Sequence, residues 1–389
     1  MPAGGPKTAL ILTGGGARAA YQVGVLMAIR DLLPDQKRNP FPIICGTSAG
    51  AINAAHLAAS AENFGVGVGQ MLDIWSNVSA GDVYRADALG ICSTATRWMA
   101  AFAVGWLVKK GPHALLDNSP LRQLLGKHID FSGIDSAIAN RALHSVSITC
   151  SGYSSGHSVS FFQGCPDLDP WLRTQRLGTH VKLDVDHVLA SSAIPFIFPA
   201  VKLHREYFGD GSMRQVAPIS PAIHLGADKI LVVGAGRMAT AEGSREHSEH
   251  YPSLAQIAGH ALSSIFLDSL YVDLERAARI NRTLSLIPEK IRQEQGMSLR
   301  SIEVLVISPS ERLDHLAASH AKSLPWPVRT LLRGLGAMNK HGGALTSYLL
   351  FEESYTRALI ELGRRDTEAR RDEVLAFLEV GHQESGAST

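Results

Sequence analysis

Two short apolar runs near the start of the chain each end in a turn containing glycine, and a helical stretch follows each of them. The first run covers residues 8–13 and leads, after three glycines, into a helical pattern over 18–33 that Pro34 ends. The second run covers 41–45, and good helix formers occupy 49–59. Two strand–turn–helix units in succession predict an α/β fold built on a parallel sheet.

The rest of the chain adds further strands and then helices. Two runs, 143–151 and 157–162, alternate between apolar and polar residues across a turn bounded by glycines, which predicts a β-hairpin. From Ser253 onward the apolar residues recur at helical spacing. Beyond these, we expect strands at 229–233 and 301–307, closing helices at 345–362 and 372–380, and a polar loop at 239–250.

Composition limits the classes of function open to the chain. Of 389 residues, 45% are hydrophobic, which is ample for a buried core. Lys and Arg number 37 against 36 Asp and Glu, so a net charge of +1 argues against a general nucleic-acid binder. The four cysteines form no Cys-x-x-Cys pair and have no metal-ligand spacing with histidines, which favours a reduced, cytoplasmic protein. They are Cys45, Cys92, Cys150 and Cys165.

Neither a signal peptide nor a membrane-spanning segment is expected. The longest apolar stretch, 98–108, is too short to cross a bilayer, which needs about 20 helical residues. This stretch and 326–335 both combine tryptophan, leucine and cations, so each fits either a core helix or an interfacial surface. We favour core helices, with peripheral contact at the inner membrane face as the alternative.

A G-x-S-x-G sequence, Gly46-Thr47-Ser48-Ala49-Gly50, lies between the second predicted strand and its helix. A sharp strand-to-helix turn has no room for side chains at its flanking positions and exposes the serine hydroxyl at the sheet edge. Ser48 is therefore a candidate nucleophile. The alternative is a serine that only caps the helix.

A second glycine-rich turn, Gly14-Gly15-Gly16-Ala17-Arg18-Ala19, lies between the first strand and its helix. Consecutive glycines let backbone N–H groups converge, and a helix N-terminus adds partial positive charge, so the loop suits a phosphate or an oxyanion. A dinucleotide site would need an acidic residue at the end of the second strand, where Gly46-Thr47-Ser48 stands instead. Parallel neighbouring strands would bring both turns to one edge of the sheet.

A serine nucleophile also needs a base to accept its proton. Asp210 lies on a glycine-flanked turn, residues 207–212, after the apolar run 193–201. Alone, an Asp-Gly pair is usually only a turn. The chain's 16 histidines leave a histidine base open as well.

Taken together, the loop 14–19, the turn 46–50 and the pair Asp210-Gly211 resemble the motifs of the patatin-like phospholipase family, in the family's order. The segment 189–201 is also similar to the family's approach to its catalytic aspartate, and the resemblance covers about 8–236. It implies a three-layer fold with a central, mostly parallel sheet flanked by helices. The sequence departs from the family pattern at two positions. Ala19 stands where glycine is frequent, and Ser212 stands where glycine or alanine is frequent.

The resemblance further implies a dyad without histidine: Ser48 as nucleophile and Asp210 as base. The N–H groups of Gly15 and Gly16, with Ala17 as a further candidate, would form the oxyanion hole. Independently of the resemblance, Arg18 could orient the loop or meet an anionic head group, and a solvated first-turn arginine is the alternative. The expected function is lipid acyl hydrolysis of the phospholipase or lysophospholipase type, with phospholipid or another acyl ester as substrate and no cofactor or metal.

We expect a catalytic domain over 8–236, a mainly helical C-terminal extension over 253–380 that packs on it, and a flexible tail over 381–389. Three alternatives stay open. A non-catalytic lipid-binding protein could share the fold, and a dinucleotide site could occupy the first turn. An α/β-hydrolase esterase with a Ser-Asp-His triad would take its histidine late in the chain, from His224, His260, His315 or His341.

Overall fold

The computed structural model describes most of the chain, namely residues 6–87, 114–236, 253–297, 299–334, 336–338 and 343–379. Three of the predicted segments, the apolar run 98–108, the polar loop 239–250 and the tail 381–389, lie outside these residues.

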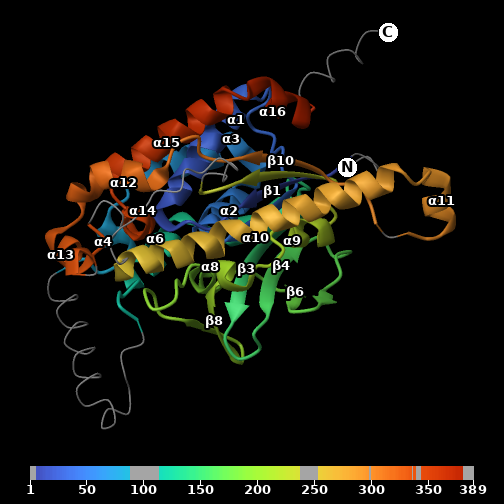
Figure 1. Ribbon diagram of the computed structural model, residues 1–389. Helices are drawn as coiled ribbons and strands as arrows, with labels where there is room; N and C mark the ends of the chain where they lie inside the picture. Colours follow the sequence, from blue (N-terminus) through green and yellow to red (C-terminus); the bar gives the residue numbers. More distant parts are fainter. Residues whose placement is uncertain are drawn as a thin grey trace, which may run out of the picture.

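In the described part of the chain, ten strands form a single sheet (Figure 1). Its order is β10-β9-β1-β2-β3-β4-β6-β5, and β8 joins β3 and carries β7. The pairs from β10 to β3 are all parallel, whereas β3 pairs with β4 and β8 in the antiparallel sense. The strands are β1 (Thr8–Leu12), β2 (Ile43–Thr47), β3 (Ser145–Gly152), β4 (Ser158–Gly164), β5 (Trp171–Arg173), β6 (Arg176–His180), β7 (Val201–Leu203), β8 (Glu206–Asp210), β9 (Lys229–Val233) and β10 (Glu303–Ile307).

Helices cover both faces of this sheet, because its strands are apolar on both sides. Along β1, Leu10 and Leu12 belong to one hydrophobic cluster and Ala9 and Ile11 to another. The first cluster lies under α1 (Ala20–Leu32), α2 (Ala49–Ala59), α3 (Phe64–Asn77) and α15 (Glu353–Glu368); the second lies under α9 (Ser220–His224) and α10 (Leu254–Ser285). The result is the three-layer arrangement expected from the sequence.

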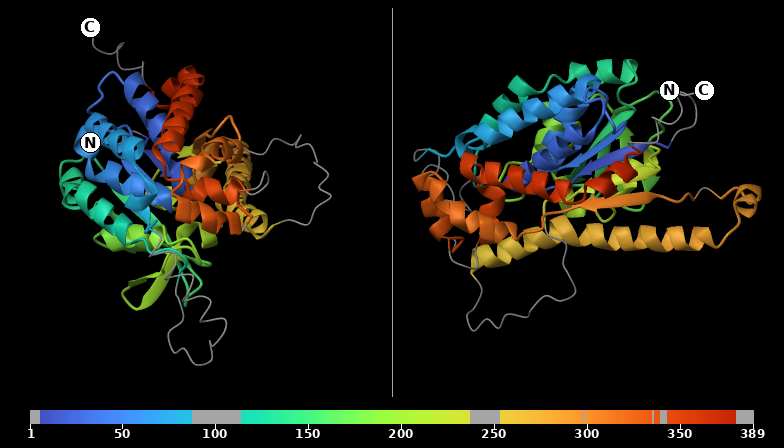
Figure 2. Two further views of the ribbon diagram at one scale, coloured as in Figure 1. Left: turned by 90° about the vertical axis from the view of Figure 1, so that its left-hand side faces the viewer. Right: turned by 90° about the horizontal axis from the view of Figure 1, so that it is seen from above.

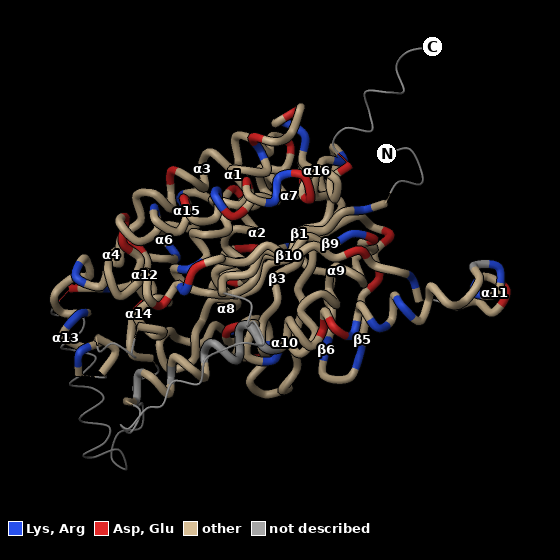
Figure 3. Tube along the Cα trace, turned by 45° about the horizontal axis from the view of Figure 1, so that its top comes forward, with Lys and Arg blue, Asp and Glu red and all other residues tan. Residues whose placement is uncertain are grey.

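Shorter helices complete the molecule. They are α4 (Ala80–Val83), α6 (Ser119–His128), α7 (Ser132–Ala139), α8 (Val185–Ser191), α11 (Glu289–Glu294), α12 (Leu313–His320), α13 (Trp326–Gly334), α14 (Gly343–Leu349) and α16 (Arg371–Phe377). In Figure 2, α10 runs along the body and extends past it, with α11 near its far end. Figure 3 shows that charged residues lie mainly on the outer helices and loops, while the central strands carry few.

The strands at 8–13, 41–45, 229–233 and 301–307 and the hairpin 143–162 are confirmed, with small shifts of their ends. The single helix predicted over 345–362 is wrong, since the chain forms α14 and α15 with a break between them. At this break Phe351 is buried and stacks on Trp75, with 6.2 Å between ring centroids. The break therefore coincides with a tertiary contact that the helical pattern in the sequence does not encode.

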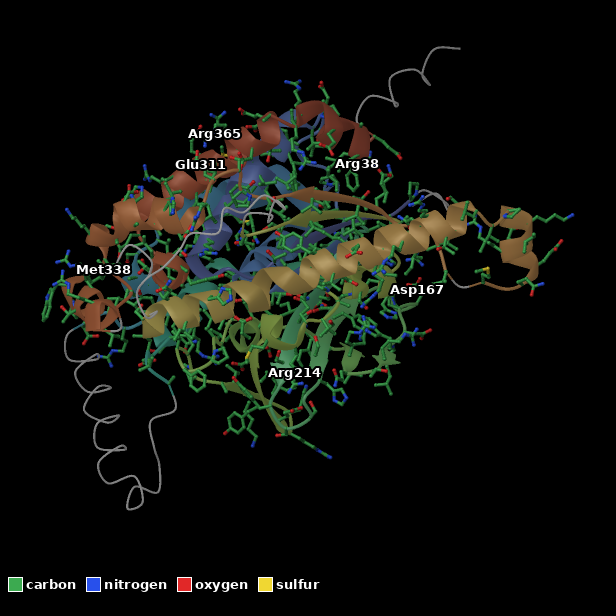
Figure 4. All side chains as sticks on the ribbon, viewed as in Figure 1. Arg38, Asp167, Arg214, Glu311, Met338 and Arg365 are labelled. Atoms are coloured by element: carbon green, nitrogen blue, oxygen red, sulfur yellow. The ribbon has the colours of Figure 1, made fainter. Side chains whose placement is uncertain are left out.

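The C-terminal region is built into the same core. β10 pairs with β9 at the edge of the sheet, and one hydrophobic cluster includes residues from Leu10 to Phe377. On the surface, the side chains of Arg365 and Glu311, labelled in Figure 4, form an ion pair of 2.6 Å that ties α15 to the segment before α12. The domain boundary predicted between 236 and 253 stays a prediction.

Candidate active site

Ser48 occupies the turn between β2 and α2, in a conformation that few residues other than glycine adopt. Its backbone has φ 55° and ψ −132°, and it is 1% exposed. Gly46 and Gly50 flank it, and a β-carbon at Gly50 would overlap the carbonyl oxygen of Leu12 in β1. The turn is therefore packed directly against the neighbouring strand, which leaves no space for a larger residue at Gly50.

Asp210 lies at the end of β8 and contacts Ser48, although 162 positions separate them in the sequence. The antiparallel pairing of β8 with β3 places Asp210 opposite Cys150, one strand away from β2. The Ser48 hydroxyl donates a hydrogen bond to Oδ2 of Asp210, with an oxygen–oxygen distance of 2.5 Å. This is the length of a strong bond to a carboxylate.

The environment of Asp210 makes its carboxyl group a stronger base than an ordinary aspartate. The side chain is 1% exposed, and burial raises its pKa from 3.8 to about 6. Hydrogen bonds from Ser48 and from the backbone N–H of Ser212, the latter at 3.0 Å to Oδ1, oppose this rise. The group is thus still mainly ionised at neutral pH, but its affinity for a proton is high.

Ser191 is a site residue that the sequence analysis missed. It ends α8, and its hydroxyl accepts a hydrogen bond of 2.9 Å from the backbone N–H of Ser48. The same hydroxyl donates to the carbonyl of Thr149 in β3 at 2.6 Å. Ser191 therefore fixes the strained turn to the sheet. The only signal in the sequence was its place in the small-residue segment before Asp210.

The glycine-rich loop lies beside this turn. Gly14 follows β1, Gly15 is extended with φ 169°, and Gly16 has φ +56° and begins a short 3₁₀ helix (Gly16–Ala19). Ala17 and Ala19 are fully buried. The residue before the loop is also tied to the turn after β9, because the Thr13 hydroxyl accepts a 3.0 Å hydrogen bond from the N–H of Ala235. Gly211 begins the turn directly after Asp210.

Gly16 and Ser48 open onto one cavity of about 50 Å³. Its wall is almost entirely apolar and comes mainly from α2, α3, α6 and the segment after α8. The lining residues are Gly16, Ser48, Ala49, Ile52, Ile74, Trp75, Val78, Val83, Leu121, Leu124, Ser192, Ile194, Phe198 and Phe351.

Arg18 does not face this cavity. It is 5% exposed, and its guanidinium group bonds to residues of α14 instead. Of the three interpretations offered by the sequence, a solvated arginine is wrong, because the side chain is buried.

The histidines of the triad alternative lie elsewhere. His224 stacks on Trp171 with ring centroids 4.8 Å apart, His260 and His315 are exposed, and His341 lies outside the described residues. Among the residues that the structure describes, no histidine lines the cavity. Within the same residues, no group of three or more His, Cys, Asp or Glu side chains is placed to hold a metal ion.

Comparisons with known proteins identify the family of the chain. The family model for patatin-like phospholipases matches residues 10–223. A curated protein named cGAMP-activated phospholipase, from Pseudomonas aeruginosa, is 27% identical over 209 residues. The match covers 54% of this chain and 53% of that protein, so the chain spans about half the length of this relative.

Two solved structures are more distantly similar. VipD from Legionella pneumophila is 11% identical with a TM-score of 0.35, over 92% of this chain and 67% of that one. ExoU from Pseudomonas aeruginosa, in complex with SpcU, is 14% identical with a TM-score of 0.26, over 96% and 79%. Similarity this weak carries no weight beside the family match.

The family model spans more than half of the sequence and includes the glycine-rich loop, the Ser48 turn and the Asp210 turn. The chain therefore belongs to the patatin-like phospholipase family.

Proposed function

We propose that this chain is a lipid acyl hydrolase of the phospholipase or lysophospholipase type, with Ser48 as nucleophile and Asp210 as base. The observation that carries the proposal is the 2.5 Å hydrogen bond between the Ser48 hydroxyl and the Asp210 carboxylate in a buried site. The substrate class comes from the family, whose members are described as phospholipases.

In the proposed reaction, the Ser48 oxygen attacks the carbonyl carbon of the ester while its proton passes to Oδ2 of Asp210. The raised pKa of Asp210 brings its basicity closer to neutral pH, which favours this transfer. The proton then goes to the leaving alcohol, and an acyl–Ser48 ester remains. A water molecule then attacks this ester while Asp210 accepts its proton, and that proton passes to the Ser48 oxygen as the fatty acid leaves.

The charge that develops on the ester oxygen needs hydrogen-bond donors that are already in place. Gly16 and Ala17 open the 3₁₀ helix, where N–H groups have no acceptor within the helix itself. Gly16 lines the cavity together with Ser48. These two N–H groups, with that of Gly15, are the donors that we assign to the oxyanion hole.

The acyl chain would occupy the apolar part of the cavity, and Ile52, Trp75 and Phe198 supply much of its wall. Burial of methylene groups against such side chains stabilises a bound lipid by about 0.8 kcal/mol per group. An apolar wall beside the nucleophile suits a fatty acyl ester better than a polar substrate.

Contact with a lipid surface is part of the proposal, although α13 is a poor candidate for it. Pro327, Val328 and Leu332 on this helix are buried, while Trp326 is 64% exposed. The apolar face of 326–334 thus belongs to the core, as we favoured from the sequence. No helix in the described residues is both long enough and apolar enough to span a membrane.

Labelling with a fluorophosphonate probe tests the nucleophile, and ester hydrolysis by single variants tests the base. We expect Ser48→Ala to abolish both labelling and hydrolysis, and Asp210→Asn to lower kcat by about 10²–10⁴-fold. His224→Ala, His260→Ala, His315→Ala and His341→Ala are the controls and should keep wild-type activity.

Two results would count against the proposal. A histidine variant that is inactive, together with a fully active Asp210→Asn protein, would support the triad. A folded protein whose Ser48 is never labelled would support a lipid-binding role without catalysis. A screen of head groups and acyl-chain lengths then defines the substrate.

A further inference from the structure

The glycine-rich loop rests directly on the C-terminal region. A β-carbon built on Gly16 would overlap the carbonyl oxygen of Tyr348, in the last turn of α14. Because Gly16 also has φ +56°, its conformation and its contact both require glycine. The loop backbone is therefore held against a helix more than 300 positions away in the sequence.

Arg18 reinforces this contact with its guanidinium group. Its Nε–H donates to the Ser347 hydroxyl at 2.8 Å, and an Nη1–H donates to the Tyr348 hydroxyl at 3.2 Å. The guanidinium carbon also lies 4.0 Å from the centre of the Tyr348 ring, in cation–π geometry. A buried arginine whose donors are engaged in this way is not free to bind a substrate head group.

The helix that Arg18 contacts is itself firmly placed. The carbonyl of Leu349, at the end of α14, accepts a 2.9 Å hydrogen bond from the buried Tyr84 hydroxyl. Within α14, the Ser347 hydroxyl donates to the carbonyl of Ala344 at 2.6 Å. A cation near the C-terminal end of a helix is also favoured by the helix dipole. α14 thus offers Arg18 a fixed set of partners.

We propose that Arg18 is a positioning residue that fixes the glycine-rich loop against α14, so that the C-terminal region completes the oxyanion hole. This inference rests on the proposed function of the loop. Arg18 is the third residue of the 3₁₀ helix, and its own N–H donates to the carbonyl of Gly15. Loss of its side-chain anchors would therefore move the N–H groups of Gly15, Gly16 and Ala17. A shift of about 1 Å in such groups costs about 10²-fold in rate.

Three variants of the full chain separate this role from head-group binding. Arg18→Met removes the guanidinium group, and Arg18→Lys keeps the positive charge but lacks the several N–H donors that the planar guanidinium group holds in a fixed geometry. Tyr348→Phe removes one acceptor, keeps the ring, and remains informative if Arg18→Met does not fold. Tyr21→Phe is the matched control, because the Tyr21 side chain is buried and its hydroxyl also joins the first part of the chain to the C-terminal region, through a 3.0 Å bond to Asp366 in α15 rather than to α14.

Hydrogen–deuterium exchange is the first measurement, because it does not depend on activity. We expect Arg18→Met, and to a lesser degree Tyr348→Phe, to accelerate exchange in peptides covering 14–19 and 343–349, with no change in β2. Tyr21→Phe should leave both peptides unchanged. Unchanged exchange in the Arg18→Met and Tyr348→Phe proteins would overturn the inference, whether or not the wild-type protein hydrolyses esters.

Steady-state kinetics are the second measurement, with a neutral soluble ester and with vesicles of an anionic phospholipid. For a positioning residue, Arg18→Met lowers kcat about 100-fold on both substrates with little change in KM, and Arg18→Lys does not restore the rate. A higher KM confined to the anionic vesicles, with rescue by Arg18→Lys, would overturn the inference in favour of head-group binding. If the wild-type protein hydrolyses neither substrate, the proposed function fails, and the hydrogen–deuterium exchange result alone decides whether Arg18 positions the loop.

Discussion

Replacing Asp210 by asparagine should make the protein more stable at neutral pH while it lowers kcat by about 10²–10⁴-fold. Burial raises the pKa of Asp210 from 3.8 to about 6, so the folded protein binds this proton more tightly than the unfolded chain does. The stability that protonation contributes is complete below about pH 3.8 and is lost as the pH rises through about 6. At neutral pH the wild-type protein therefore carries a buried charge that destabilises it.

The size of the effect follows from the two pKa values. A difference of about two units corresponds to about 3 kcal/mol at pH 8, where the carboxyl group is ionised in both states. At pH 5 most folded molecules hold the proton, and the difference falls to about 1.6 kcal/mol. Asparagine matches aspartate in shape. Its oxygen can accept from the N–H of Ser212, and its amide can donate to the Ser48 oxygen as a protonated Asp210 would. The Ser48 O–H loses its acceptor in both cases, so asparagine still matches the protonated aspartate.

Urea unfolding at pH 8 and pH 5 measures this difference. We expect Asp210→Asn to exceed wild type by about 3 kcal/mol at pH 8 and by about half of that at pH 5. Asp73→Asn, at an exposed aspartate of α3, is the control and should show the same small difference at both pH values. An Asp210→Asn protein that is less stable than wild type at pH 8, or whose advantage does not change with pH, would refute the reasoning.

Three further predictions concern the site. With a pKa of about 6 for Asp210, about nine-tenths of its carboxyl groups are ionised at pH 7 and about a tenth at pH 5. We therefore expect kcat/KM for a non-ionising ester to fall about tenfold from pH 7 to pH 5, and an unchanged kcat/KM would exclude Asp210 as base. Ser191→Ala leaves the N–H of Ser48 without its acceptor and should cost about 1–3 kcal/mol in unfolding free energy together with a lower kcat, whereas full activity would contradict its supporting role. Ile52→Trp fills part of the cavity and should lower the rate for long acyl esters while sparing acetyl esters; an equal effect on both would place the acyl chain elsewhere.

The parts of the fold that the sequence predicts are those in which neighbouring residues determine the structure. The turns at Gly14–Gly16 and Gly46–Gly50 could be placed because strand, turn and helix follow one another directly. The position of Asp210 beside Ser48 is different, since it depends on the pairing of β8 with β3. Nothing near Asp210 encodes that pairing, and only the family resemblance pointed to it.

The contacts that local patterns could not predict join distant parts of the chain. Ser191 acts on Ser48 across 143 positions, and Arg18 reaches Tyr348 across 330. An arginine in a first helical turn looks the same in the sequence whether it is solvated or buried. The apolar spacing around Phe351 likewise fits an uninterrupted helix until its ring meets Trp75.

The proposed nucleophile and base both occupy positions that oppose folding. The backbone of Ser48 costs about 1–3 kcal/mol, and the buried charge of Asp210 costs about 3 kcal/mol at neutral pH. Such conformations persist only where the surrounding packing allows no alternative, and here Gly50 lets the turn press on β1 while Ser191 ties it to β3. The glycines of the motif therefore have a role besides making room for substrate. They allow the close packing that keeps Ser48 and Asp210 in hydrogen-bond contact, although the Ser48 backbone and the buried Asp210 charge both cost free energy.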